Sequence, residues 1–261
     1  MAKVYDRLTE IERSIIKTYR KELWAKFVRA IDDYELISPG DKICVCISGG
    51  KDSMILAKLF QELHRHTKFP FEVKFLMMNP GYNKENLDLI MHNLEVLGIP
   101  AHIVESNIFE VANSQEKNPC YLCARMRRGV LYKAAKEMGC NKIALGHNYD
   151  DAIETYMMNI LYNGVALCFE PVTYYEDKNI SIIRPLVFAN EYTIKKCAAE
   201  NNLPVAKKVC PADGNTKREE TKTLLQQLKS QNKNALKNIF TAILNSDEFK
   251  KYEVTTIDND E

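Results

Sequence analysis

Short apolar runs alternate with amphipathic stretches along most of the chain, and this alternation constrains the fold more than any other feature. The runs that read as buried strands are "KICVCIS" (42–48), "FEVKFLMMN" (71–79), "PAHIVES" (100–106), "NKIALGH" (141–147) and, as a candidate fifth, "ISIIRPL" (180–186). Helical patterns follow them at 52–66, 83–98, 119–139, 150–164 and 191–202. Strands joined by helices of this length form right-handed βαβ units. The sequence therefore predicts an α/β domain with a parallel sheet.

Helical patterns also flank this region on both sides. Residues 7–33 have the pattern of one long amphipathic helix, and the tail from about Lys217 is polar, Lys-rich and helical. We expect an N-terminal helical extension (1–38), the α/β domain (39–216) and a helical C-terminal tail (217–261). Its last residues, 255–261, are expected to be disordered.

The composition of the chain bears on its cellular compartment and on whether its cysteines form disulfide bonds. No apolar run is long enough to span a bilayer and the N-terminus has no apolar signal core, so we expect a cytoplasmic protein without a membrane partner. The cytosol keeps thiols reduced, which argues against a disulfide framework for the eight cysteines. Five of them lie singly in apolar or mixed runs and are predicted to be small core residues: Cys44, Cys46, Cys140, Cys168 and Cys197. The net charge of +1 neither indicates nor excludes a nucleic-acid partner.

The segment "SGGKDS" (48–53) interrupts the first strand-to-helix connection with polar residues. Its glycines let successive N–H groups point into one concavity, and the following helix adds the positive end of its dipole. It is not a Walker A loop, because Val45 stands where that motif has its first glycine. An acidic residue beside phosphates, Asp52, is expected to act through a cation such as Mg²⁺. The alternative is a plain glycine-rich turn, which would not need Ser, Lys and Asp together.

The pattern S-G-G-x-D-S after the first strand resembles the PP-loop of the N-type ATP pyrophosphatases. The stretch "LGHNYDDAIET" (145–155) is similar to the one that follows the fourth strand in the RNA-modifying members. The resemblance implies an adenine nucleotide alpha hydrolase-like, Rossmann-like fold. It also implies an enzyme that splits ATP between its α and β phosphates and adenylates a substrate oxygen. The residues it assigns to ATP are Ser48, Gly49, Gly50, Lys51, Asp52, Ser53, Gly146 and His147. Taken alone, His147 would more often be a structural histidine.

Three cysteines differ from the rest. Cys120 and Cys123 form a C-x-x-C pair, a spacing used for zinc and for iron–sulfur ligation, and Cys210 is the obvious further ligand. A closed zinc site needs a fourth ligand, and no histidine follows His147. Three thiolates suit a cluster with one open iron. A persulfide on these cysteines without any cluster is an alternative.

Residues 119–164 narrow the resemblance to the tRNA 2-thiocytidine synthetases, and the match continues through "IIRPL" and "NEYTI" to Cys210, covering about residues 40–218. These enzymes pair a PP-loop with three cysteines that hold a 4Fe–4S cluster, and they thiolate cytidine 32 of tRNA. The resemblance implies that Cys120, Cys123 and Cys210 hold such a cluster here. Where this family often has a further cysteine, the chain has Asp213.

The expected reaction is adenylation of cytosine O2 followed by its replacement with sulfur. We expect Lys51, Arg127 or Arg128 to stabilise charge on the phosphates, and Asp52 and Asp151 to bind Mg²⁺ or position the reacting groups. Contacts to tRNA are expected from Arg128, Lys207, Lys208 and Lys217. Sulfide or a cysteine desulfurase would supply the sulfur, and a homodimer is compatible with the sequence.

Three other functions stay open at this point. One is thiolation of a tRNA uridine. Another is a PP-loop ligase or sulfurtransferase that acts on a small molecule and holds structural zinc at the cysteines. The third is an inactive RNA-binding protein, against which the intact Ser48–Ser53 loop argues.

Overall fold

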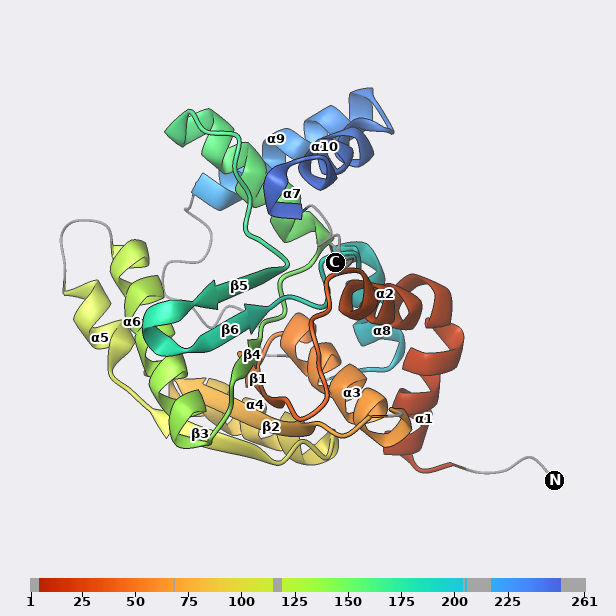
Figure 1. The fold of residues 1–261 in the computed structure, drawn as a ribbon, viewed down its shortest axis with the longest axis vertical. Coiled ribbons are helices and arrows are strands. Elements are labelled where there is room, and N and C mark those ends of the chain that lie inside the picture. Colours follow the sequence, from red (N-terminus) through yellow and green to blue (C-terminus); the bar gives the residue numbers. More distant parts are fainter. Residues whose placement is uncertain (1–4, 68, 115–118, 204, 206–216, 250–261) are drawn as a thin grey trace, which may run out of the picture.

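The computed structural model describes residues 5–67, 69–114, 119–203, 205 and 217–249. Its centre is a six-stranded sheet in the order β3-β2-β1-β4-β6-β5 (Figure 1). The strands are β1 (Lys42–Ile47), β2 (Glu72–Asn79), β3 (Ala101–Glu105), β4 (Lys142–Ala144), β5 (Val172–Tyr175) and β6 (Ile180–Ile183). All neighbours pair in parallel except β5, which is antiparallel to β6. The predicted α/β class with a parallel sheet is confirmed, while β5 was not predicted.

Helices cover both faces of the sheet, because successive side chains of a strand point to opposite sides. In β1, Ile43 and Val45 pack into the larger core, and Cys44 and Cys46 face the smaller one. The larger core contains buried side chains from α1 (Arg7–Arg13), α2 (Ala25–Asp33), α3 (Lys51–His66), α4 (Lys84–Val96) and α8 (Glu191–Glu200). The smaller core lies against α6 (Pro119–Glu137), which follows the short helix α5 (Ile108–Asn113).

The N-terminal region is not the single regular helix that we predicted. Two π-helical turns, η1 (Ser14–Thr18) and η2 (Arg20–Trp24), separate α1 from α2. The backbone leaves the helical region at Tyr19, whose hydroxyl donates a hydrogen bond to Glu200 of α8. Such insertions shift the apolar face, and here Ile11, Ile15 and Leu23 stay buried on both sides of the break.

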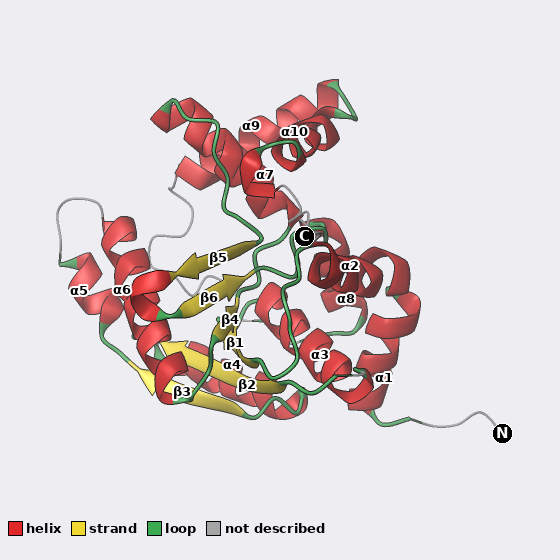
Figure 2. Cartoon of the chain, in the orientation of Figure 1, coloured by secondary structure: helices red, strands yellow, loops and turns green. Residues whose placement is uncertain are grey.

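A second group of helices lies beyond one end of the sheet (Figure 2). It consists of α7 (Tyr149–Met158), its π-helical extension η3 (Asn159–Asn163), α9 (Lys217–Gln231), α10 (Ala235–Leu244) and the single turn η5 (Asp247–Phe249). A further single turn, η4 (Glu176–Lys178), joins β5 to β6. Both α9 and α10 pack against α7. The helical tail therefore joins the α/β domain through α7. Residues 255–261 lie outside the described residues, and the proposed limits 1–38, 39–216 and 217–261 stay a prediction.

Among the described residues, no helix combines the length and the apolar character that crossing a lipid bilayer requires.

Candidate active site

The loop between β1 and α3 is held in shape by its own serines. The Ser48 backbone N–H donates to Ser53 Oγ over 3.1 Å, and Ser53 Oγ donates to the Gly50 carbonyl over 2.9 Å. Gly49 has φ +81°, a conformation that glycine adopts without strain. Gly50, at the N-cap of α3, has no side chain to cap the helix, so the first N–H groups of α3 are available to an anion.

Gly146, which follows β4, brings a second backbone segment against this loop. A Cβ atom at Gly146 would lie 3.3 Å from the Asp52 carbonyl carbon and 3.3 Å from the Ser53 nitrogen. The glycine in "LGHN" therefore allows the close approach of the two segments, and a side chain here would push the loop by a few tenths of an ångström.

A cavity of about 590 Å³ opens at this junction, between the carboxyl ends of the strands and α6. It brings together predicted residues from three distant segments: Ser48, Asp52 and Ser53; Arg127 and Arg128; Gly146 and His147. It also contains residues that sequence reasoning missed, namely Met78, Tyr82, Phe169, Tyr175 and Arg184. The sequence did contain a hint that Arg184 is functional, because this arginine is the only charged residue in the apolar run "ISIIRPL".

Helix α6 supplies Arg127 and Arg128, two of the arginines that line this cavity. The Arg127 guanidinium lies 5.2 Å from the centre of the Phe109 ring, and its Nε is buried without a hydrogen-bond partner among the described residues. Cys123 lies one helical turn before Arg127 and is half-buried. Cys123 also stands next to Ala124, one of the α6 residues that line the cavity.

The predicted metal ligands are only partly described. Cys120 belongs to the first turn of α6, but its side chain, like Cys210, lies outside the described residues, as do Lys207 and Lys208. Within the described part of the chain, no group of three or more His, Cys, Asp or Glu side chains is arranged to hold a metal ion. The ligation by three cysteines thus stays a prediction.

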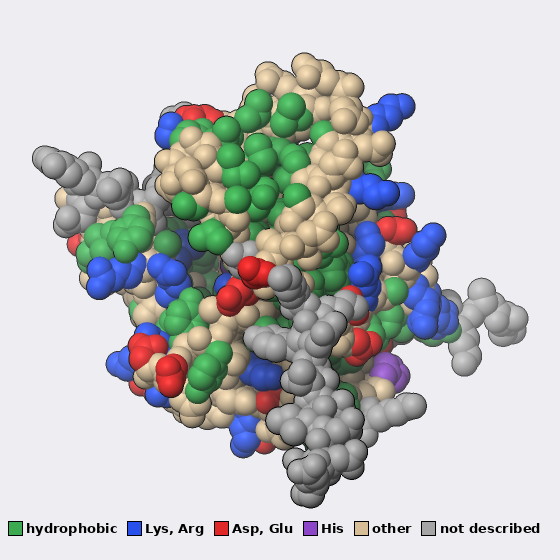
Figure 3. All heavy atoms as spheres, turned by 45° about the horizontal axis from the view of Figure 1, so that its top comes forward, with side chains coloured by type: hydrophobic (Ala, Val, Ile, Leu, Met, Phe, Trp, Pro, Cys, Tyr) green, Lys and Arg blue, Asp and Glu red, His purple; other side chains and the backbone are tan. Residues whose placement is uncertain are grey.

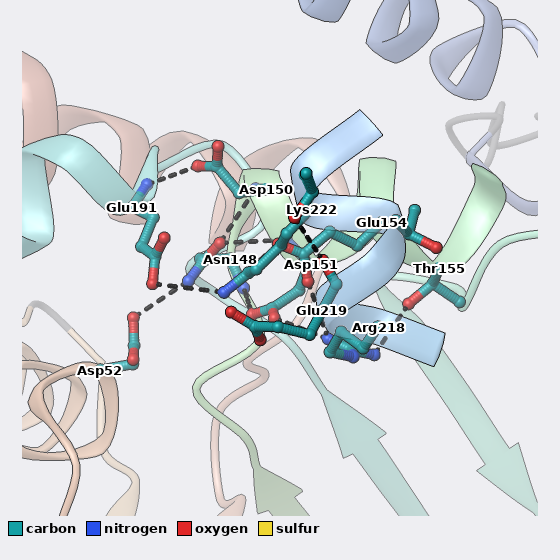
Figure 4. A network of polar contacts seen from close by, with 12 residues as sticks. Asp52, Asn148, Asp150, Asp151, Glu154, Thr155, Glu191, Arg218, Glu219 and Lys222 are labelled. Carbon is teal, nitrogen blue, oxygen red and sulfur yellow. Dashed lines mark hydrogen bonds and ion pairs between the residues drawn. The ribbon is translucent and has the colours of Figure 1, made fainter. Parts of the chain in front are cut away.

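Lys51 contacts Asp52 and Glu191. These two carboxylates belong to a polar network that joins the loop to α7, α8 and α9 (Figure 4). The Lys51 Nζ donates to Asp52 Oδ2 over 2.9 Å and to Glu191 Oε1 over 3.0 Å. Burial lowers the pKa of Lys51, but these two carboxylates outweigh it, and the net shift is upward. On the other side, Asp52 Oδ1 accepts from Asn148 Nδ2 over 3.0 Å. Lys51 is therefore a fixed cation whose charge is balanced by the carboxylates of Asp52 and Glu191.

Asp151 is engaged at both of its oxygens. Oδ2 accepts from the Asn148 backbone N–H over 2.9 Å, which completes a capping box at the start of α7. Oδ1 accepts from Arg218 of α9 over 3.0 Å, and Arg218 also reaches Glu154 Oε2 over 3.2 Å. The metal-binding or positioning role of Asp151 stays a prediction, and the contacts described here are structural ones.

His147 is half-buried in the wall of the cavity, which Phe169 and Arg184 also line. Its ring centre lies 5.2 Å from that of Phe169. Burial first, and then the positive charge of Arg184 and Arg218, lower the pKa of His147 to about 3. The imidazole is therefore neutral at physiological pH, and its buried Nδ1 has no hydrogen-bond partner among the described residues.

Lys217 lies apart from the cavity. It is exposed, with Nζ 4.8 Å from the centre of the Tyr162 ring and 3.2 Å from Glu220 Oε2. Its contact with tRNA, like that of Arg128 at the cavity wall, stays a prediction.

Most of the remaining cysteines pack as predicted. Cys44, Cys46, Cys140 and Cys197 are buried. Cys168 is only half-buried, and its thiol donates to the Ala152 carbonyl over 3.4 Å. Burial raises the pKa of Cys197 to about 12, and a hydrogen bond with Cys44 together with burial raises that of Cys140. Such thiols carry almost no thiolate at neutral pH.

One exposed surface is apolar. Its residues come from η3 and the loop after it: Ile160, Leu161, Tyr162, Val165 and Leu167. Figure 3 shows apolar side chains gathered on the end of the molecule that carries α7, α9 and α10.

Residues 19–227 match the PP-loop domain family. The chain belongs to this family. The family that the sequence predicted is confirmed, and the assignment of its PP-loop to the Ser48–Ser53 segment stays a prediction. Among its relatives, a tRNA-cytidine(32) 2-sulfurtransferase of Alcanivorax borkumensis is 34% identical over 241 residues, which cover 90% of this chain and 84% of the relative. A tRNA-cytidine(32) 2-sulfurtransferase of Dechloromonas aromatica is 33% identical, with 88% and 82% covered.

A solved structure has the same fold. The U34-tRNA thiolase NcsA from Methanococcus maripaludis, determined with its 4Fe-4S cluster, superposes with a TM-score of 0.68 at 24% identity, over 84% of this chain and 76% of that chain. This similarity supports the PP-loop fold described above.

Proposed function

We propose that this PP-loop protein is an ATP-dependent tRNA sulfurtransferase, which adenylates the C2 oxygen of cytidine 32 and replaces it with sulfur to give 2-thiocytidine. Relatives named tRNA-cytidine(32) 2-sulfurtransferase match almost the whole chain. The single observation that carries the proposal is the cavity that the loop after β1 and helix α6 line together. Ser48 and Asp52 of the predicted PP-loop line this cavity together with Arg127 of α6, which follows Cys123 by one helical turn.

The chain's own residues account for the first step. The PP-loop and the N-terminus of α3 hold the phosphates, and Lys51, Arg127 and Arg128 offset their negative charge. The O2 atom of the base attacks the α-phosphorus, the bond between the α- and β-phosphates breaks, and pyrophosphate leaves. Sulfur then attacks C2, and AMP leaves with the original oxygen. Asp52 lies in the cavity and would hold Mg²⁺.

Cys120, Cys123 and Cys210 have thiol side chains, the donors that bind iron–sulfur clusters in proteins. Cys120 and Cys123 stand three residues apart in α6, a spacing that puts two side chains on the same side of a helix. With Cys210 they provide three thiolate donors, which iron and zinc both accept. A 4Fe–4S cluster at these residues would supply an iron that carries the incoming sulfur.

The remaining assignments belong to the same proposal. The partner macromolecule is tRNA, contacted by Arg128, Lys207, Lys208 and Lys217. The sulfur comes from sulfide or a cysteine desulfurase, and the protein acts in the cytoplasm. A homodimer would be supported by the exposed apolar surface around η3, which a second copy could cover.

The test is an anaerobic reaction with purified protein, ATP, sulfide and tRNA that lacks thiolation. We expect AMP, pyrophosphate and one 2-thiocytidine per tRNA, measured by mass spectrometry of the digested tRNA. Iron and acid-labile sulfide should be present in the wild type and lost in Cys123→Ala. The matched control is Cys197→Ala, which removes a buried cysteine from the opposite core and should keep both.

Three results would contradict the proposal. Zinc without iron after anaerobic reconstitution would favour the small-molecule alternative. A thiolated uridine in place of cytidine would correct the substrate. No thiolated base of any kind would falsify the function as a whole.

A further inference from the structure

The cavity has two sides that the PP-loop separates. The loop follows β1, and β1 lies between β2 and β4 in the sheet. On the β2 side the cavity is lined by Met78 and Tyr82, and on the side of β6 and β5 it is lined by Arg184, Phe169 and Tyr175. A nucleotide on the PP-loop and a second substrate therefore have separate walls to occupy.

Arg184, just after β6, is buried in the second wall and only partly used by the protein. Its Nη1 donates to the Glu170 carbonyl over 2.5 Å and to Thr173 Oγ1 over 3.0 Å. Among the described residues, no hydrogen bond involves its Nε or Nη2, and Nε is buried. The guanidinium therefore donates hydrogen bonds through Nη1, while the N–H groups of Nε and Nη2, which form one edge of the guanidinium, have no acceptor among the described residues.

Unsatisfied polar atoms concentrate at this cavity. In the described part of the chain, four residues have a buried side-chain N or O atom without a partner, and three of them line the cavity: Arg127, His147 and Arg184. Buried polar atoms without partners are rare in folded proteins, and a catalytic role is one of the accepted explanations.

Aromatic rings surround Arg184. Its guanidinium carbon lies 5.1 Å from the centre of the Phe169 ring. The Tyr132 and Tyr175 rings, 5.4 Å apart, continue the same wall. Flat apolar surfaces beside a hydrogen-bonding edge are the features by which proteins hold an unstacked RNA base.

The hydrogen-bonding edge distinguishes among the bases. Two adjacent N–H donors of a guanidinium pair with two adjacent acceptors. Cytosine offers such a pair in O2 and N3, and guanine offers one in O6 and N7. Uracil has an N–H at N3, which would face a donor, and adenine alternates donors and acceptors along its edges. The edge of Arg184 therefore fits cytosine and disfavours uracil, and it does not fit the adenine of ATP.

We propose that Arg184 is a specificity-determining residue that reads the O2 and N3 atoms of the target cytosine, in a base pocket completed by Phe169, Tyr175 and Tyr132. This inference rests on the proposed function for the identity of the reaction, but its geometry is independent of the cysteines. Discrimination between cytosine and uracil is then set on the β6 side of the cavity, away from the PP-loop.

The test compares two tRNA transcripts that differ only in having C or U at position 32, with wild type, Arg184→Lys and a control. Lysine keeps the positive charge and removes the two-donor edge. We expect the wild type to prefer C over U in kcat/KM, and Arg184→Lys to reduce this preference on the order of 10- to 100-fold. The KM for ATP should stay within about twofold, which also shows that the variant is folded. Arg29→Lys is the matched control, because Arg29 also lies over a ring, 4.5 Å from the centre of Phe188, outside the cavity.

A binding measurement separates this inference from the proposed function. Equilibrium binding of the same two transcripts, in the presence of a non-hydrolysable ATP analogue, needs no sulfur transfer. Tighter binding of the C transcript by wild type and Arg29→Lys, with equal binding of both by Arg184→Lys, would support the pocket even if no base is thiolated. An Arg184→Lys protein that keeps the full preference for C, or a wild type that has none, would overturn it.

Discussion

Replacing Gly146 with alanine tests the close contact between the β4 end and the PP-loop. The new Cβ would meet the Asp52 carbonyl carbon and the Ser53 nitrogen at 3.3 Å, and the Asp52 Cβ at 3.4 Å. All three belong to the loop and the first turn of α3, so no flexible side chain can move aside. The φ angle of Gly146 is not in the left-handed region, so the cost comes from contact and not from backbone strain.

The size of the effect follows from the displacement. Restoring ordinary contact requires the loop to move by a few tenths of an ångström. A shift of ~1 Å can cost ~100-fold in rate, so we expect ~4-fold slower pyrophosphate release, which corresponds to ~0.8 kcal/mol. Overpacking should also lower the free energy of unfolding by ~1–3 kcal/mol.

The assays are pyrophosphate release, ATP titration calorimetry and urea unfolding. Gly129→Ala is the matched control, because it lies in α6, its Cβ would meet nothing within 4 Å, and it should stabilise the helix by ~1 kcal/mol. A Gly146→Ala protein with wild-type ATP affinity, turnover and stability would refute the claim that a side chain at this position pushes the loop.

Two further predictions concern stability. The folded-state pKa of His147 is about 3, below its unfolded value of 6.5, so the unfolded chain binds more protons between these values and stability falls as the pH drops below about 6.5. Between pH 7.5 and 5.5 this group should account for ~1.4 kcal/mol, and His147→Asn should remove that part of the loss in urea titrations; an unchanged pH dependence would contradict the assignment. In the larger core, Glu12 Oε1 accepts from the buried Lys58 Nζ over 2.7 Å. Glu12→Ala leaves that charge without its carboxylate and should cost ~3 kcal/mol in urea unfolding, whereas the exposed Glu10→Ala should change little; equal losses would show that the pair is not stabilising.

The sequence predicted the parallel strands and the loop because these depend on local patterns. A buried apolar run, a glycine turn and a following helix are each encoded within a few residues. The antiparallel β5 (Val172–Tyr175) is different, because it exists only where the open edge of β6 accepts its hydrogen bonds. Its four residues carry too little periodicity to distinguish a strand from a loop.

The sequence predicted those site residues that belong to a motif. It did not predict the residues that reach the cavity only through the tertiary fold. The glycine loop, Gly146 and His147 come from motifs, and they meet in one cavity. The carboxylate of Asp151 reads as a functional group in the sequence, yet "NYDD" is also a capping-box pattern, and the structure uses it as one. Arg184 reads as part of a strand, and only the fold shows that it faces the cavity together with Phe169.

The buried cysteines have a consequence for chemical labelling of this protein. Thiol reagents attack the thiolate, and Cys44, Cys140 and Cys197 are sheltered from both solvent and ionisation. A thiol-reactive dye added to the folded protein therefore does not label these three cysteines. The label that does react reports on the other cysteines, which include Cys120, Cys123 and Cys210, so occupancy of the predicted cluster site can be titrated without spectroscopy of iron.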